Sequence, residues 1–501
     1  MGAGRFTLEE RLAGAVWGHL VGDAVGVPYE FTGPRDPAAV QFGATGTWGR
    51  PAGTWSDDGA LMLALLDSLL GSDRGGRPSF DLDDQARRAL AWECDGAYTP
   101  DHEGRFDIGN ATAAALRRLR EGVPAVDAGP ADERSCGNGS LMRILPVALV
   151  GRDHSPARLI DEAHLASRVT HGHARCQVAC AVYSIAVAGL LRGQEPGTAL
   201  SWAFAETFRL YVEERGYEAH GVALEELRAW TGRGGSTFVP DAFWSAWDAF
   251  AGAAGYADSI RRAVAYGNDT DTTAAIAGGL AGARWGWGSI PVAWRRGMRG
   301  QDVARPLVDA LVETTGARTT RSHPLRVDEV RLADAPRLAS ATGRLGITFL
   351  PGKKRNGWTG SHWRDLDLDM ARLNELGWDA LYLLNEDREL AFCLVPEIEA
   401  VLREAGSPVL VRLPIPDPQV PTDDRAYDAT VREIVARLRA GESVVVACRG
   451  GLDRSGMTAS CVLVEAGMAP AQAMALVQAS RRGAITKDDQ RDDVRAWPHV
   501  T

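Results

Sequence analysis

The sequence contains very little lysine. Only three of its 55 Lys and Arg residues are lysines, namely Lys353, Lys354 and Lys487, and the first 352 positions have none. We interpret this bias as a coding preference for arginine. Acidic residues number 65 in the 501-residue chain, which gives a formal net charge of -10. A protein with this balance lacks the overall positive charge that attracts a nucleic-acid polymer, so we expect no such partner.

Paired cysteines and long apolar runs are also absent. The seven cysteines are scattered and form no C-x-x-C pair, which predicts neither a disulfide framework nor a structural zinc site and favours a reducing, cytoplasmic setting. Residues 1–10 include two acids and no apolar run, unlike a secretory signal. The longest uncharged apolar stretch, about residues 178–191, is shorter than the roughly 18 residues of a spanning helix. We therefore expect a buried helix and no membrane partner.

The remaining composition is that of a folded, multidomain protein. Hydrophobic residues make up 45% and charged residues 24%. Ala- and Leu-rich segments recur at three- to four-residue spacing at first, which predicts an all-α domain over residues 1–318. Residues 319–343 lack a long amphipathic period, and we expect a linker there. Residues 344–501 alternate short apolar runs with helical periods, which predicts an α/β domain with a central parallel sheet. The expected strands are residues 347–350, 380–384, 409–413 and 443–447.

The first expected helix, residues 12–26, has a glycine at every fourth position. These residues are Gly14, Gly18, Gly22 and Gly26. Spacing of four places them on one helix face, where the missing side chains allow another backbone to approach closely. Polar residues within the segment argue against a membrane helix, so we expect a tightly packed helix of a folded domain.

Two further helices are expected to begin with acidic residues beside hydroxyl residues. One starts at Ser-Asp-Asp, positions 56–58, and the other at Asp-Thr-Asp-Thr, positions 269–272. Each pattern alone is typical of a helix N-cap with acids in the first turn. Carboxylates beside hydroxyls are also hard oxygen ligands for Mg²⁺ or Mn²⁺. The two starts would make a binuclear centre if they met, which their spacing cannot show.

Six ordered segments over about residues 8–315 resemble the ADP-ribosylglycohydrolase family of the dinitrogenase reductase-activating glycohydrolase type. They are GDAVG with EF at 22–31, TWSDD at 54–58, DIGN at 107–110, GNGS with MR at 137–143, TH at 170–171 and DTDT at 269–272. In that family a compact all-α domain holds two Mg²⁺ or Mn²⁺ ions and removes ADP-ribose from proteins or small molecules.

The resemblance assigns roles to particular residues. It implies that the metal ligands are Ser56, Asp57, Asp58, Asp269, Asp271 and Thr272. It implies that the ADP-ribose cleft is lined by Gly137, Asn138, Gly139, Ser140 and His171. Glu30 becomes a candidate for general acid or base work or for gating the site, although a surface acid after a turn is an equal alternative. Ser56 stands where many members have Thr, a change that keeps the hydroxyl. Arg-linked, Ser-linked and free-metabolite substrates all remain open.

Cys448 and Arg454 form the C-x5-R spacing that surrounds one phosphate with a thiolate and a guanidinium. The spacing alone carries little weight in a chain so rich in Arg, and a buried Cys at a strand end is the plain alternative. The context favours a site, because a strand, a Gly-containing loop and a helix start follow one another here. Backbone N–H groups of such a loop cradle anions and support a cysteine nucleophile.

Residues of about 345–497 resemble the cysteine-dependent protein tyrosine/dual-specificity phosphatases, most closely the cyclin-dependent kinase inhibitor 3 type. The matching segments are LPG at 350–352, PIPD at 414–417, CRGGLDRS at 448–455 and GAI at 483–485. The resemblance makes Cys448 the nucleophile of a phosphocysteine intermediate, Arg454 the phosphoryl holder, Asp417 the general acid and Ser455 a helper in phosphocysteine release. The phosphate loop would comprise Arg449, Gly450, Gly451, Leu452 and Asp453, with no cofactor.

Three features depart from that pattern or leave it open. Ala447 stands where members usually have His, which removes one support for thiolate activation. Asp453 adds negative charge beside the anion site, as in phosphatases that act on phosphoinositides and other small molecules, so a phosphotyrosine protein is not assumed. Asp423 and Asp424 are alternative candidates to Asp417 for the general acid.

These observations predict a bifunctional cytoplasmic enzyme. Its partners would be an ADP-ribosylated protein or an ADP-ribose-containing small molecule, together with a phosphorylated substrate. In one version the phosphatase acts on a phosphorylated ADP-ribose derivative. Two alternatives are an ADP-ribose-binding reader that directs a protein phosphatase to modified partners, and a phosphatase-like domain that binds phosphoprotein without catalysis.

Overall fold

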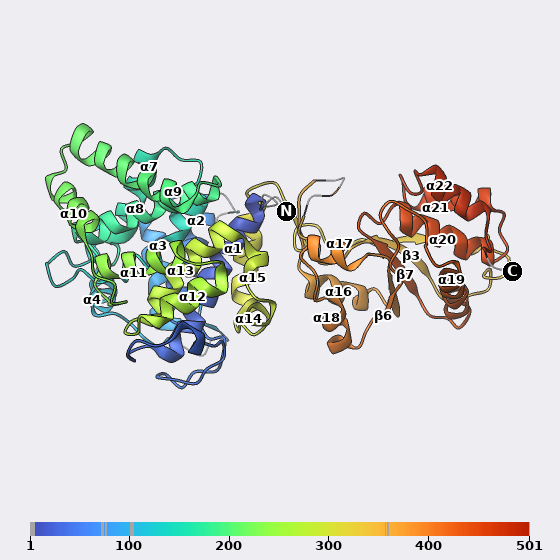
Figure 1. Cartoon of the computed structure of the whole chain (residues 1–501), viewed down its shortest axis with the longest axis horizontal. Helices are drawn as coiled ribbons and strands as arrows, with labels where there is room; N and C mark the ends of the chain where they lie inside the picture. Colours follow the sequence, from blue (N-terminus) through green and yellow to red (C-terminus); the bar gives the residue numbers. More distant parts are fainter. Residues whose placement is uncertain are drawn as a thin grey trace. The chain divides into compact units, whose positions relative to one another are not determined.

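The computed structural model describes residues 6–71, 75, 78–100, 105–355, 357 and 360–499 (Figure 1). The chain divides into two compact units, Met1–Thr315 and Gly316–Thr501, called unit 1 and unit 2 below.

The described part of unit 1 is helical, as the sequence predicted. Its only β pairing there consists of isolated bridges, such as the one between Gly137 and Phe238. The α-helices are α1 (Leu8–Gly26), α2 (Asp57–Leu70), α3 (Leu82–Asp95), α4 (Asn110–Arg120), α5 (Ala125–Ala128), α6 (Leu145–Val150), α7 (Pro156–Arg168), α8 (Ala174–Leu191), α9 (Pro196–Phe208), α10 (Glu218–Ala229), α11 (Val239–Ala251), α12 (Tyr256–Ala265), α13 (Thr270–Trp285), α14 (Val292–Arg296) and α15 (Gln301–Glu313). Short 3-10 turns lie at Val27–Tyr29, Pro37–Ala39 and Trp287–Ser289, and a π-helical turn at Arg209–Glu214 continues α9.

Helices α1 and α13 pack backbone against backbone along the glycine face of α1. A Cβ atom on Gly18 would lie 2.4 Å from the carbonyl oxygen of Gly278, and one on Gly22 would lie 2.2 Å from that of Ala274. Such distances leave no room for a side chain. The close approach predicted from the glycine spacing is confirmed. It also brings the end of α1 against the start of α13, since a Cβ on Gly26 would lie 2.3 Å from the Cα of Asp271.

Helix α8 contains the apolar stretch expected to be a buried helix. It is long and apolar enough to cross a membrane by length and composition, but 89% of that window is buried inside the structure. Apolar residues occupy all sides of the helix, and they are buried because α7, α9 and α10 pack around it. The prediction of a buried helix is confirmed.

Unit 2 is built on a five-stranded sheet with the order β2-β3-β7-β5-β6. Strands β3, β7, β5 and β6 are parallel, and β2 runs antiparallel to β3 at one edge. The strands are β2 (Asp328–Val330), β3 (Leu345–Phe349), β5 (Ala380–Leu383), β6 (Val409–Arg412) and β7 (Val444–Cys448); β1 (Arg318–Thr319) and β4 (His362–Trp363) form a separate parallel pair. The four expected strands are therefore present, each within a few residues of its predicted bounds.

Helices cover both faces of this sheet (Figure 1). Helices α16 (Leu366–Glu375), α17 (Asp387–Phe392) and α18 (Ile398–Ala405) lie on one face. Helices α19 (Asp424–Arg439), α20 (Asp453–Glu465), α21 (Pro470–Ser480) and α22 (Asp488–Arg495) lie on the other. Alternate side chains of β7 divide between the two cores, with Val444 and Val446 facing α19–α22, and Val445 and Ala447 facing α16–α18. Ala447 thus fills an apolar core.

The stretch 319–343, which we expected to be a linker, folds with unit 2 instead. It supplies the edge strand β2, and its Val330 and Leu338 are buried in the core under α19–α22. The edge strand also makes the sheet mixed rather than fully parallel. A three-residue strand is too short to show a period of two, so its sequence offered no signal.

The contact between α1 and α13 generates a stability prediction. Gly18→Ala should lower the free energy of unfolding of unit 1 by about 1–3 kcal/mol, because the new methyl group forces two backbones apart. Gly197→Ala is the matched control, since Gly197 also lies in a helix and nothing lies within 4 Å of the added Cβ. Thermal unfolding should show a lower midpoint for the first variant only, and equal midpoints would contradict the close contact.

Candidate active sites

The two acidic helix starts of unit 1 meet in the folded chain. The hydroxyls of Ser56, before α2, and Thr272, in α13, both donate to Oδ2 of Asp58, at 3.1 and 3.2 Å. Asp58 is 1% exposed and Thr272 is 4% exposed. Residues more than 200 positions apart therefore share one buried carboxylate.

More carboxylates join this cluster. Glu30, Asp269 and Asp271 are buried, and one oxygen of each lies within 4.8 Å of the others. Burial, followed by repulsion from neighbouring acids, raises the pKa of Asp57, Asp58 and Asp271 well above the usual range. Like charges held this close out of water are unfavourable without a counter-charge.

A divalent cation fits this donor set. Oδ1 of Asp58 and Oδ2 of Asp271 are buried and accept no hydrogen bond within the described ranges. Hydroxyls that donate to Asp58 keep lone pairs available for a metal. Hard oxygen atoms of this kind suit Mg²⁺ or Mn²⁺. The six residues that the family resemblance implied as ligands, together with Glu30, therefore line one buried cluster.

Two acids that received no role from the sequence also belong here. Asp23, in α1, accepts hydrogen bonds from the backbone N–H groups of Ser56, at 2.9 Å, and Gly59, at 2.8 Å, and so holds the start of α2. Burial raises its pKa to about 7. Asp107 has a positive φ of 55°, and burial, with the charge of Asp269 second, raises its pKa to about 6. Both lie in the segments that resemble the family, which was the available signal.

Glu30 faces the cluster rather than solvent. It is 3% exposed, and the indole N–H of Trp48 donates to its carboxylate. Burial, followed by repulsion from Asp107, raises the pKa of Glu30 to about 8. The surface alternative considered for this residue does not match its position.

The loop 137–140 lies beside the same carboxylates. The side-chain amide of Asn138 donates to Oδ2 of Asp269 at 2.7 Å. A Cβ on Gly139 would lie 2.8 Å from Cε1 of His171, so the imidazole packs directly on the loop. Burial, with the charge of Arg143 second, lowers the pKa of His171 to about 3, which keeps the ring neutral. Ser140 accepts a hydrogen bond from the hydroxyl of Ser167 at 2.9 Å.

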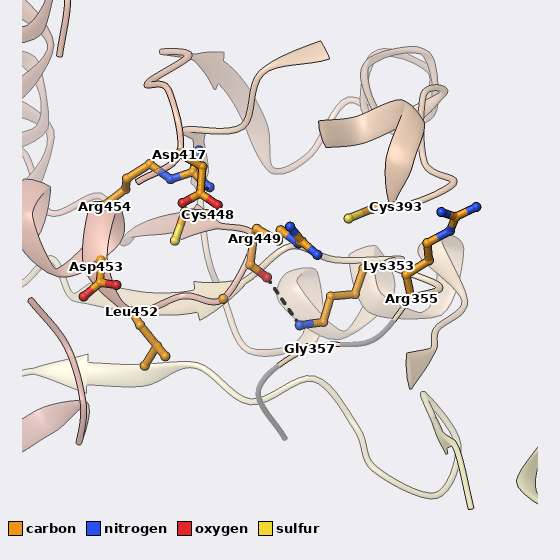
Figure 2. Close-up of a pocket in the computed structure, with 11 residues that line it drawn as sticks. Lys353, Arg355, Gly357, Cys393, Asp417, Cys448, Arg449, Leu452, Asp453 and Arg454 are labelled. Carbon is orange, nitrogen blue, oxygen red and sulfur yellow. Dashed lines mark hydrogen bonds and ion pairs between the residues drawn. The ribbon is translucent and has the colours of Figure 1, made fainter. Parts of the chain in front are cut away.

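Unit 2 has a pocket of about 300 Å³ at the end of β7 (Figure 2). Cys448 is the last residue of β7, and α20 starts five residues later at Asp453. The pocket is lined by Lys353, Arg355, Gly357, Cys393, Asp417, Cys448, Arg449, Gly450, Leu452, Asp453 and Arg454.

The carbonyl groups of the loop after Cys448 accept hydrogen bonds from two basic side chains, of which Lys353 lines the pocket and Arg481 does not. Nζ of Lys353 donates to the carbonyl of Arg449 at 3.3 Å, and the guanidinium of Arg481 donates to those of Gly450 and Gly451 at 3.3 and 2.9 Å. In a trans peptide the following N–H points the opposite way from the carbonyl. The N–H groups of Gly451 and Leu452, opposite the two carbonyls that Arg481 holds, are therefore left for the pocket side, as an anion cradle requires.

Arg454 is fixed by a glutamate that the sequence analysis missed. Both oxygens of Glu389 accept from its guanidinium at 2.7 Å, and the carbonyl of Ile415 accepts at 2.8 Å. Burial opposes ionisation of Glu389, but the bonds and charge of Arg454 hold its pKa below the usual value. Such a bidentate pair sets the plane of the guanidinium. In the sequence Glu389 reads only as an acid in the first turn of α17.

The three candidate general acids occupy different places. Asp417 lines the pocket, with Oδ1 at 3.2 Å from Nη2 of Arg454 (Figure 2). Asp423 caps α19 by accepting from the N–H of Ala426 at 3.0 Å, and Asp424 is the first residue of that helix. Neither of these two lines the pocket.

Two other expected residues have distinct surroundings. The carboxylate of Asp453 accepts from the backbone N–H and the hydroxyl of Thr486, at 2.7 and 2.9 Å, so its charge is partly engaged away from the anion site. The hydroxyl of Ser455 is buried and makes no hydrogen bond within the described part of the chain. It is thus available to a group bound at the adjacent loop.

Comparison with known proteins follows this division. Residues 5–321 match the family model of ADP-ribosylglycohydrolase, and residues 389–496 match that of the Swiss Army Knife protein, DSP-PTPase phosphatase domain. Unit 1 is thus a helical glycohydrolase domain and unit 2 an α/β phosphatase domain. The chain belongs to the ADP-ribosylglycohydrolase family, with a DSP/PTP phosphatase domain fused after the glycohydrolase domain.

Several known proteins resemble one part of the chain. ADP-ribosylarginine hydrolase Tri1 of Pseudomonas putida (strain GB-1) is 31% identical over 292 residues, which cover 57% of this chain and 73% of that protein. A solved ADP-ribosylglycohydrolase-related protein complex is 31% identical, covers 62% of this chain and 99% of its own, and has a TM-score of 0.50. A structure of kinase associated phosphatase (KAP) is 22% identical, covers 35% of this chain and 95% of its own, and has a TM-score of 0.31.

The carboxylate cluster predicts metal-dependent stability. Mg²⁺ or Mn²⁺ added to EDTA-treated protein should raise the midpoint of thermal unfolding, because binding to the folded state alone adds about 2.7 kcal/mol at 100 times Kd. Asp271→Asn should remove at least half of this rise. The same variant without metal should be no less stable than the wild type, because one repulsive charge is gone.

Asp36→Asn is the matched control for the metal titration. Asp36 is exposed, unlike the buried acids of the cluster, and it caps the turn at Pro37–Ala39. It should keep the full rise in midpoint. Equal rises for both variants would contradict a metal site at Asp271.

Proposed function

We propose that this chain is a bifunctional hydrolase. Unit 1 would cleave ADP-ribosyl linkages with two divalent cations, and unit 2 would hydrolyse phosphomonoesters through Cys448. The observation that carries the first activity is the buried meeting of Asp58 with Ser56 and Thr272 beside Asp269 and Asp271. The second rests on the pocket that gathers Cys448, Asp417 and Arg454.

For unit 1 we favour the arginine linkage as the first substrate to test. The name of the Pseudomonas putida relative, ADP-ribosylarginine hydrolase, supports this choice. Hydrolysis breaks the bond from C1″ of the ribose and adds hydroxide to that carbon and a proton to the leaving group. Bound cations would orient the ribose hydroxyls and polarise the attacking water.

The side chains around the cluster have separate tasks in this proposal. Asp58 accepts hydrogen bonds from the hydroxyls of Ser56 and Thr272, which leaves the lone pairs of these hydroxyls available to the metal ions. Asn138 orients the carboxylate of Asp269. Glu30, held by Trp48 at the edge of the cluster, moves the proton between water and leaving group. Neutral His171 supports the loop 137–140 against the sugar.

In unit 2 the sulfur of Cys448 attacks phosphorus, and the bond to the leaving oxygen breaks. Asp417 gives its proton to that oxygen, while the loop N–H groups and Arg454 bind the phosphoryl oxygens. Water then attacks the phosphocysteine, gives its proton to Asp417 and releases phosphate and the thiolate. The buried hydroxyl of Ser455 would hydrogen-bond the departing sulfur. Glu389 keeps Arg454 oriented throughout.

The fusion suggests that both sites serve one pathway. A phosphorylated ADP-ribose derivative would be a substrate for both sites, since it carries a ribosyl bond for unit 1 and a phosphomonoester for unit 2. We therefore propose this class as the shared substrate family. A cytoplasmic setting, where ADP-ribose compounds and free thiols coexist, is part of the same proposal.

Release of ADP-ribose tests unit 1. With Mg²⁺, the wild type should release ADP-ribose from an Arg-ADP-ribosylated peptide and less from a Ser-linked one, as measured by mass spectrometry. EDTA or Asp271→Asn should lower the rate at least about 100-fold, because even outer changes at metal sites cost 10–100-fold, whereas Asp36→Asn should keep it. Binding of ADP-ribose with no metal-dependent release from either peptide would instead indicate a reader.

Phosphate release tests unit 2. Cys448→Ser should abolish hydrolysis of ADP-ribose 1″-phosphate and of para-nitrophenyl phosphate. Asp417→Asn should slow the first substrate by about 10²–10⁴-fold and the second less, because nitrophenolate leaves without a proton. Asp423→Asn, the same change at a helix cap, should affect neither rate. Unchanged turnover of every phosphorylated ADP-ribose derivative in Cys448→Ser would refute the shared substrate.

A further inference from the structure

Two of the three lysines in the chain lie next to each other at the phosphatase pocket. Lys353 and Lys354 are only 5% and 7% exposed, although lysine side chains are rarely buried. Only Lys353 lines the pocket, whereas Nζ of Lys354 donates to the carbonyl of Gly352. A buried lysine in a chain that otherwise uses arginine calls for a local reason.

Lys353 belongs to a group of cations on one side of Cys448. Arg449 and Arg355 also line the pocket (Figure 2). Both guanidinium groups lie over the ring of Phe392, at 4.8 and 4.6 Å from its centroid. Nζ of Lys353 lies 4.4 Å from the ring centroid of Phe349. Aromatic faces thus hold three cations in place.

Neither Lys353 nor Arg449 forms an ion pair with an acid in the described part of the chain. In the described part of the chain no carboxylate lies within 4.0 Å of either, and the one polar contact of the lysine is the carbonyl of Arg449 at 3.3 Å. Burial lowers the pKa of Lys353 to about 8. By contrast, Arg454 is paired with Glu389 and Asp417. The loop N–H groups and Arg454 already suffice for the phosphoryl group at Cys448.

We propose that Lys353, Arg449 and Arg355 form a second anion subsite, so that the substrate of unit 2 carries a further phosphate or diphosphate besides the phosphomonoester at Cys448. This inference rests on the proposed phosphatase function and narrows its substrate class. A second phosphate would supply a counter-charge to the buried Lys353 and the half-buried Arg449, which have no carboxylate partner within 4.0 Å in the described part of the chain. A neutral phosphotyrosine ring would not supply it.

Competitive inhibition of para-nitrophenyl phosphate hydrolysis tests the subsite. Inorganic phosphate, diphosphate and triphosphate differ in how far they can extend from the phosphate loop at Cys448 toward the three cations of the proposed subsite. In the wild type at least one of the longer anions should have an inhibition constant at least tenfold below that of phosphate. We compare the variants by the ratio of the inhibition constant of phosphate to that of the longer anion. In Lys353→Gln and Arg449→Gln this ratio should fall about tenfold. The ratio is informative even if a variant also disturbs the loop, because such damage weakens the binding of all three anions alike.

Lys354→Gln is the matched control, because it removes the neighbouring buried lysine that does not line the pocket. Its ratio should equal that of the wild type. Equal inhibition by all three anions, or a ratio unchanged in both pocket variants, would overturn the proposal. If no hydrolysis occurs at all, the phosphatase function fails, and calorimetric titration of Cys448→Ser with the same anions still tests the subsite separately.

Discussion

A charge removed from water needs an opposite charge, and both candidate sites are organised by this constraint. In unit 1 buried carboxylates gather around Asp58 and Asp271, where burial and mutual repulsion raise the pKa of each and favour cations. In unit 2 Arg454 is neutralised by Glu389, while Lys353 and Arg449 have no carboxylate partner in the described structure. The first arrangement suits divalent metals, and the second suits a ligand with more than one phosphate.

Close backbone packing makes the first of these arrangements possible. The glycine face of α1 lets α13 approach until no side chain fits between them, and the end of that contact places Asp271 against Gly26. Asp23 of the same helix then holds the start of α2 through backbone N–H groups. Stability and site geometry therefore depend on the same contact, so a single added methyl group should affect both.

Helix starts are used in opposite ways in the two units. At α2 and α13 the chain supplies its own carboxylates, which leaves cations as the external component. At α20 the carbonyls of Gly450 and Gly451 are held by Arg481, which lies outside the pocket lining, and the N–H groups that follow them remain for an external anion. The positive end of a helix dipole assists both arrangements, because it stabilises negative charge from either source.

Local sequence determined the helices of unit 1, the four parallel strands and the C-x5-R loop, since their periodicity and turn residues act over short distances. The ordered segments also predicted the acids of unit 1's candidate site, except for Asp23 and Asp107. Tertiary structure alone brought Ser56 and Thr272 to one carboxylate, paired Glu389 with Arg454, separated Asp417 from Asp423, and folded residues 319–343 into an edge strand. These outcomes depend on residues distant in sequence, whose meeting no local pattern encodes.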